Sequence, residues 1–112
     1  METVEIPKDV WNPISSLVRH GVYKNEKSAL INIVHDLSIS KMKEYKSSMQ
    51  GFEKKYGMLF EDFDKQIKSG VKEDFEKWDD YIEWKAYFKT YEYWKSVHEE
   101  SSQWLNQNHK YS

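Results

Sequence analysis

The densest group of ionisable side chains in the sequence is acidic and lies between residues 73 and 84. Lys77 is the only base among six carboxylates. These carboxylates belong to Glu73, Asp74, Glu76, Asp79, Asp80 and Glu83. Glu76 with Asp80, and Asp79 with Glu83, are spaced four residues apart. Like charges at that spacing destabilise a helix by roughly 0.2–0.5 kcal/mol per pair. Local helix stability therefore does not explain the run.

Three interpretations of this acidic run are open, and we rank them. The first is a solvated helix face, whose position near a helix N-terminus suits the helix dipole. The second is a docking surface for a basic partner. The third is a carboxylate pair for acid–base or Mg²⁺ chemistry, which ranks last because no supporting residues accompany it.

Other residues that could catalyse a reaction or bind a metal are scattered. The chain has no cysteine, and its four histidines show neither His-x-x-x-His nor His-Glu-x-x-His spacing. No serine lies in a Gly-x-Ser-x-Gly motif, and the four glycines form no phosphate-binding loop. We expect the histidines at the surface or at helix ends, with a metal shared between two copies as the alternative. The sequence predicts no enzyme, no metal and no cofactor.

Two stripes of large apolar side chains share the segment that carries the acidic run. At 100° per residue, Phe75, Trp78 and Ile82 fall in a sector about 60° wide. A sector about 120° wide on roughly the opposite side holds Trp84, Tyr87, Phe88, Tyr91 and Trp94. One stripe can face the core of the protein, but the other needs a cover, because large apolar patches are seldom left in water.

We expect the wider stripe to anchor a protein partner, since Trp and Tyr are the usual energetic anchors of interfaces. The acidic residues at its edge are Asp79, Asp80 and Glu83. They would supply a specificity rim for a basic partner. The alternative is that both stripes are internal.

The elements that position these side chains are predicted to be mainly helical. Apolar periodicity predicts helices over residues 9–20, 25–51, 60–67 and 72–100. Asp9 and Asn25 are candidate N-caps, and Gly21 follows the first helix at the usual terminating position. His20 then lies at a helix C-terminus. Residues 101–112 are polar and predicted to be frayed.

One short strand is predicted at the N-terminus. Residues Thr3–Ile6 alternate polar and apolar side chains and stop at Pro7, which indicates a strand with Val4 and Ile6 on its buried face. A lone strand leaves its backbone groups unpaired, and no second strand candidate is present. We therefore expect this strand to pair with that of a second copy, giving a mainly α homodimer.

Composition divides the chain near residue 50. Residues 1–49 hold seven basic and six acidic side chains, whereas residues 50–112 hold ten lysines and thirteen acidic side chains. Fifteen of the eighteen aromatic residues also lie in the second part. This contrast favours two modules, residues 1–50 for dimerisation and DNA binding and residues 51–112 as a helical extension that binds a partner. The alternative is one continuous fold with the same bias.

The first 50 residues resemble the ribbon-helix-helix family. Val4–Pro7 and Gly21–Ile31, with a Gly-x-Tyr turn before a capped helix, carry the resemblance. Proteins of this family form intertwined homodimers whose strands pair as a ribbon that can enter the DNA major groove. Many are antitoxins with a C-terminal extension that silences a toxin. Residues 55–63 and 78–87 look like the tails of small prokaryotic, especially archaeal, antitoxin-like proteins.

The resemblance implies an antitoxin of a type II toxin–antitoxin pair that also represses its own operon. The implied DNA-binding residues are Thr3, Glu5, Lys24, Asn25, Lys27 and Ser28. The expected dimer interface consists of Val4, Ile6, Leu30, Ile33, Val34 and Leu37. The toxin would meet the acidic and aromatic helices of residues 51–112. The alternative is a helical dimeric adaptor without DNA-binding function.

The DNA-binding part of the resemblance departs from the family pattern. Glu5 would repel phosphates, and Arg19 is the only arginine, although arginine is the commonest specific reader of bases. The net charge of −2 also lacks the basic footprint of a DNA-binding protein. We expect any DNA binding to be weak and strongly dependent on salt.

The predicted location is the cytoplasm. The longest stretch without a charged side chain is Val10–Val18, far short of the roughly 20 apolar residues of a transmembrane helix. Residues 1–6 show no basic segment followed by an apolar run, so we expect no signal peptide. The partners expected are a second copy, a toxin and operator DNA, with no membrane.

Overall fold

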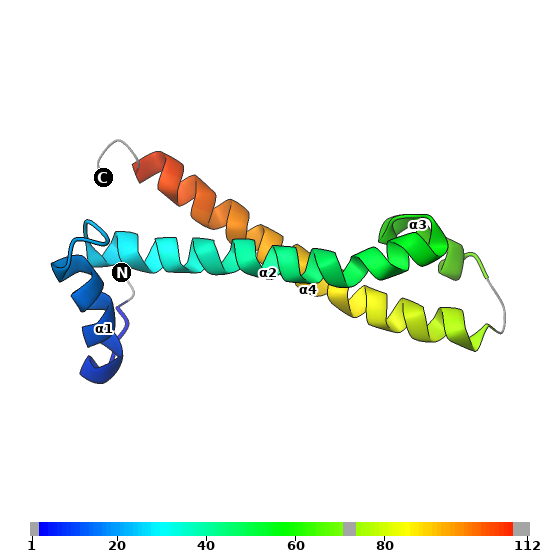
Figure 1. Ribbon diagram of the computed structural model, residues 1–112, viewed down its shortest axis with the longest axis horizontal. Coiled ribbons are helices and arrows are strands. Elements are labelled where there is room, and N and C mark those ends of the chain that lie inside the picture. Colours follow the sequence, from blue (N-terminus) through cyan, green and yellow to red (C-terminus); the bar gives the residue numbers. More distant parts are fainter. Residues whose placement is uncertain (1–2, 71–73, 109–112) are drawn as a thin grey trace.

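Two long helices that cross near their middles form the body of the molecule (Figure 1). The structure, a computed structural model, describes residues 3–70 and 74–108. Its elements are α1 (Lys8–Arg19), α2 (Glu26–Tyr56), α3 (Phe60–Lys68) and α4 (Phe75–Asn108). α2 and α4 run in opposite directions, with α1 at one end of the molecule and α3 at the other. α1 packs on α2, and α3 packs on α4.

The ends of α2 show how local sequence sets helix boundaries. At its start, the side chain of Asn25 accepts a hydrogen bond from the Ser28 N–H at 2.8 Å, so the predicted N-cap is confirmed. At its end, Gly57 takes a left-handed conformation (φ 64°) and its N–H donates to the Glu53 carbonyl. A residue with a Cβ would be strained at Gly57.

The predicted N-terminal strand is wrong. Residues 3–7 form no regular secondary structure, and Val4, expected to be buried, is 81% exposed. Within one chain no second extended segment is present in residues 3–70 or 74–108 to pair the backbone of this segment. Pro7 also begins α1, because its carbonyl accepts hydrogen bonds from the N–H groups of Val10 and Trp11. The described fold is all-α, without the ribbon of the ribbon-helix-helix fold.

Several helix limits differ from those expected. Pro7, rather than Asp9, occupies the N-cap position of α1, and Asp9 lies in the first turn. α2 continues without a break through residue 50, where composition suggested a division. α4 extends to Asn108, so residues 101–108 are helical rather than frayed. The expected start of this helix at Lys72, and residues 109–112, lie outside the described residues.

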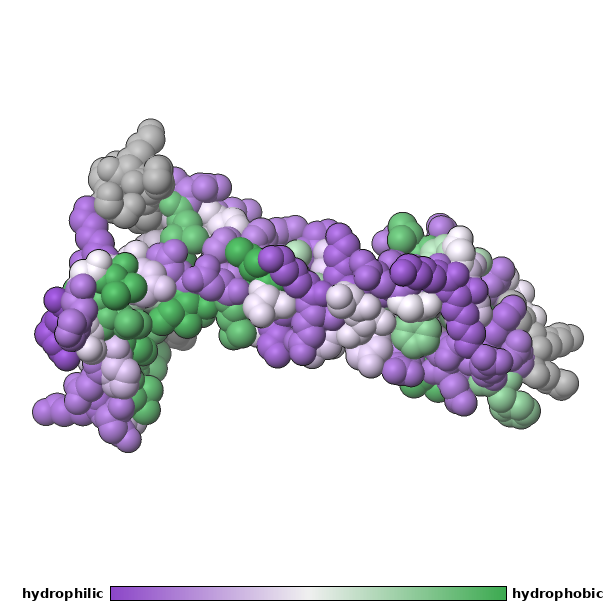
Figure 2. All heavy atoms as spheres, in the orientation of Figure 1, coloured by the Kyte–Doolittle hydropathy of each residue, from purple (hydrophilic) through white to green (hydrophobic). Residues whose placement is uncertain are grey.

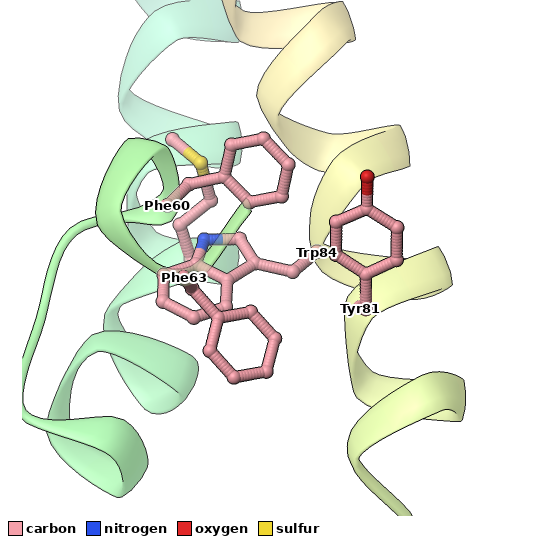
Figure 3. Packing of buried hydrophobic residues seen from close by; sticks show 5 residues of the cluster. Phe60, Phe63, Tyr81 and Trp84 are labelled. Atoms are coloured by element: carbon pink, nitrogen blue, oxygen red, sulfur yellow. The ribbon is translucent and has the colours of Figure 1, made fainter. Parts of the chain in front are cut away.

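The aromatic core lies where the end of α2, α3 and the first half of α4 meet. Its buried apolar members are Met49, Phe60, Phe63, Tyr81 and Trp84 (Figure 3). The Trp84 ring is central: it stacks on Phe63 at 5.1 Å and on Phe52 at 5.5 Å between ring centroids. Phe60 meets the same ring edge-on at 5.6 Å. Aromatic pairs at these distances add about 0.5–1.5 kcal/mol each beyond area burial.

The opposite end of the molecule has almost no buried core. Among the described residues of α1 and the first half of α2, the only buried side chains are Ala29 and Ser38. α1 buries no residue at all, although its sequence is strongly amphipathic. The apolar side chains of this end are therefore only half covered by the protein itself.

Candidate interaction surfaces

The acidic run holds α4 against α2. Lys55, near the end of α2, pairs with Glu76 at 2.6 Å and with Asp80 at 2.7 Å. The Tyr56 hydroxyl donates a second hydrogen bond to Asp80. Hydrogen bonds from Lys55 and Tyr56 lower the pKa of Asp80. Burial and the bond to Asp80 raise the pKa of Tyr56 to about 12. Asp80, one of the predicted partner-facing carboxylates, is thus engaged within the chain, as is Glu76 of the same acidic run.

A second carboxylate ties α3 to α4. The Tyr81 hydroxyl donates to Asp64 at 2.6 Å, and Lys68 pairs with the same carboxylate at 2.9 Å. The pKa of Asp64 is lowered by these two partners, and that of Tyr81 is raised by its bond to Asp64 and by burial. Within residues 3–70 and 74–108, no three His, Asp or Glu side chains converge in a way that would hold a metal ion.

The remaining described carboxylates of the acidic run lie at the surface. Asp74 accepts the N–H of Lys77 at 3.1 Å and so helps to begin α4. Glu83 accepts the Tyr87 hydroxyl at 3.1 Å, and this bond raises the pKa of Tyr87. Asp79 and Glu83 are both exposed. Glu73 lies outside the described residues.

The two apolar stripes of α4 take the opposite places from those predicted. Trp84 is fully buried, and Tyr87, Phe88 and Tyr91 pack against the core around it. Trp94 is half-buried, and its ring meets that of Tyr93 edge-on. The stripe expected to anchor a partner is thus largely internal, because it faces α2 and α3. Helical periodicity separates the two faces but does not show which one those helices cover.

The narrower stripe forms the exposed outer face of α4. Phe75 is 81%, Trp78 52% and Ile82 64% exposed. The ring of Trp78 lies 5.5 Å from that of Tyr81 between centroids. We call these three residues the α4 outer strip.

A second apolar surface lies where α1 meets the start of α2, and Figure 2 shows hydrophobic residues gathered in this angle. Ile33 and Val34 are each 40% exposed and Leu37 is 45% exposed, whereas Leu30 is half-buried. These four residues are the α2 members of the predicted dimer interface, and we call them the α2 face. The other two predicted members, Val4 and Ile6, are exposed in the segment before α1.

The α2 face borders a cleft of about 420 Å³ between the start of α2 and the end of α4. Its apolar lining comes from Ile31, Val34, Val97 and Trp104. The polar residues of the lining are Glu100, Ser101, Gln103 and Gln107. The cleft therefore adds to the partly covered apolar surface at this end.

Next to this cleft, two histidines form a polar layer where α2 and α4 pack. The rings of His35 and His98 stack at 4.8 Å between centroids, and His35 Nδ1 is 2.9 Å from the Ser101 hydroxyl. Ser38 and Ser101 are buried and donate to the carbonyls of His35 and His98. Both histidines were expected at the surface or at helix ends, whereas they pack between α2 and α4. The sequence signal for this layer is a His-x-x-Ser motif in each helix.

The predicted DNA-binding residues fall in the exposed N-terminal segment and at the start of α2. Thr3, Glu5 and Lys27 are exposed. The N–H of Ser28, one of the implied DNA-binding residues, is already bonded to Asn25, and the Ser28 hydroxyl accepts from Asn32 at 3.2 Å. A phosphate at this helix end would therefore compete with the N-cap.

A family model described as "Uncharacterized protein MJ0235 family" matches residues 11–104. The chain belongs to this family. The match to the MJ0235 family spans α1 to α4 and includes the α2 face and the α4 outer strip. No curated protein and no solved structure matches the chain. None of the described helices of this MJ0235-family chain is long and apolar enough to cross a membrane.

Proposed function

We propose that this protein is a non-enzymatic helical adaptor that works as a homodimer through the α2 face and the apolar side of α1. The observation that carries the proposal is the uncovered apolar end of the molecule. The α2 face is 40–45% exposed at three of its four residues, and α1 contributes no buried residue. A second copy presenting the same surface would complete a core there, as symmetric dimer interfaces do.

The overall dimensions support association. The accessible surface is 8669 Å², whereas a compact monomer of 13.6 kDa exposes about 6,600 Å². The radius of gyration is 19.9 Å, against about 13 Å for a compact domain of 112 residues. The chain thus carries roughly 2,000 Å² of extra surface. A stable dimer needs only about 800 Å² from each partner.

Charge does not oppose pairing of two copies at the end of the molecule formed by α1 and the start of α2. Residues 1–49 hold seven basic and six acidic side chains, so the N-terminal part is nearly neutral. The acidic run of residues 74–83, at the start of α4, lies at the other end of the molecule (Figure 1). A dimer joined at α1 and α2 therefore brings the less charged parts of the two copies together.

Sedimentation equilibrium at micromolar concentration tests the dimer. We expect a dimer for the wild type and a monomer for Ile33→Asp, because a carboxylate buried without a partner is costly. The matched control is Ile82→Asp, the same substitution at an exposed position of α4, which should remain dimeric. A monomeric wild type, or equal dissociation of both variants, would contradict the proposal.

A second candidate function is the antitoxin. The observation that favours it is the exposed apolar surface of α4 beside Asp79 and Glu83, which suits a basic toxin. Co-expression of the neighbouring reading frame with and without this protein tests it: arrested growth should be restored only by the pair. Repression of its own operon would appear in gel shifts that weaken steeply between about 50 and 200 mM salt. If neither growth rescue nor a gel shift is observed, the antitoxin function is excluded and only the adaptor proposal remains.

A further inference from the structure

The α4 outer strip is a continuous apolar surface on one side of a helix. Phe75, Trp78 and Ile82 are spaced three and four residues apart, so they stack along one face over about 10 Å. All three are mostly exposed, whereas Tyr81 and Trp84 of the same turns point into the core (Figure 3). One apolar side of α4 thus packs into the core, whereas the other is not covered by any described part of the chain.

The charges beside the strip are uneven. Asp79 lies about 40° from Phe75 around the helix axis and Glu83 about 80°. Both are exposed, and within the described residues neither forms an ion pair. Lys55 compensates Glu76 and Asp80 instead. On the opposite flank, Lys85 lies over the Tyr81 ring at 5.5 Å. The strip therefore has one uncompensated acidic edge.

We infer that the α4 outer strip binds a basic amphipathic helix of a partner protein. The apolar side of that helix would cover Phe75, Trp78 and Ile82, as helices do when they lie in apolar grooves. Its lysines or arginines would reach Asp79 and Glu83 at the edge. The inference rests on the proposed adaptor function, because a dimer joined at α1 and α2 leaves this end free for a different partner.

The charges also decide among the possible occupants. Residues 74–84 carry five acidic side chains against one lysine, so two copies of this segment repel each other. An anionic lipid surface or a nucleic acid would meet the same carboxylates with like charge. A basic helix alone satisfies both the apolar strip and its acidic edge. Trp78 is the expected anchor, since exposed Trp side chains dominate interface energetics.

A labelled peptide of about 18 lysines and leucines in helical amphipathic order, about five turns long, serves as the probe. Fluorescence anisotropy should show binding to the full-length protein that weakens as salt is added. Trp78→Ala should weaken the affinity at least about tenfold. The double variant Asp79→Lys, Glu83→Lys should weaken the affinity to the same extent, although it changes no apolar residue. Thermal melting of these variants should match the wild type, since the altered side chains are largely exposed.

The matched control is Tyr93→Ala, which removes an exposed aromatic ring of α4 outside the strip and should leave the affinity unchanged. A peptide with glutamates in place of lysines should not bind. Binding that survives Trp78→Ala, or equal binding of the acidic peptide, would overturn the inference. Sedimentation equilibrium distinguishes failure of this inference from failure of the proposed homodimer. If the protein is monomeric but still binds the basic peptide, only the homodimer is refuted. Loss of the dimer in Trp78→Ala would show that the strip joins two copies.

Discussion

Trp84 shows at the scale of a single residue how this small core is built. Its ring is fully buried among four other aromatic rings, yet among the described residues its indole N–H has no hydrogen-bond partner. The stability that Trp84 supplies therefore comes from ring packing and burial. A phenylalanine preserves most of that contact and removes a polar group that is buried without compensation.

Trp84→Ala is expected to lower the free energy of unfolding by about 3–5 kcal/mol, as large-to-small changes of buried aromatic residues do. Trp84→Phe should cost clearly less, because no hydrogen bond is lost. Urea denaturation followed by circular dichroism measures both. Trp78→Ala on the exposed side of α4 is the control and should stay within about 0.5 kcal/mol of the wild type. Equal stability of Trp84→Ala and the wild type would remove Trp84 from the core.

At the scale of elements, Asp80 joins the start of α4 to the end of α2. Its lowered pKa means that the folded state favours the carboxylate, through Lys55 first and Tyr56 second. The stability contributed by such a group is present above its unfolded pKa of about 4 and is lost as pH falls through the lower folded pKa. Asp80→Asn should reduce the melting temperature at pH 7, and the difference from the wild type should shrink on acidification. Asp79→Asn, which breaks no ion pair, should melt like the wild type across the range.

The helices were predictable because their signals are local. Asn25 caps α2 whatever else the chain contacts, and the periodicity of Phe60, Phe63 and Ile67 suffices to place α3. The end of α2 was expected near residue 51, whereas the helix continues to Tyr56 and ends at Gly57. The strand prediction failed because alternation of apolar side chains is also local, whereas a strand requires a second segment to pair its backbone.

The candidate surfaces were less accessible to sequence reasoning. Three of the four α2 residues in the predicted dimer interface are exposed, which leaves the interface itself a prediction. The sequence could not assign the two stripes of α4, because only tertiary packing decides which stripe faces α2 and α3. The contact of His35 with His98 joins residues far apart in the chain, and the only hint was the serine three positions after each.

At the scale of the whole molecule, the core is concentrated at the α3 end. The end formed by α1 and the start of α2 has few buried contacts, which predicts low local stability there. Hydrogen exchange at submicromolar concentration should therefore be fastest in α1 and slowest around Met49 and Trp84. Raising the protein concentration should protect α1 selectively, if association completes its core. Uniform protection at all concentrations would contradict this picture.

The length of α2 has a consequence for how a dimer would engage its partners. Its 31 residues form an unbroken rod of about 46 Å in a molecule 59 Å long. Two copies joined end to end, through α1 and the α2 face, would hold their outer strips at opposite tips, separated by two such rods. One short helix cannot span that gap, so bivalent capture would select partners that carry repeated, widely spaced basic helices. The fixed distance between the two strips, more than the affinity of either strip alone, would then determine which partner assemblies the dimer binds.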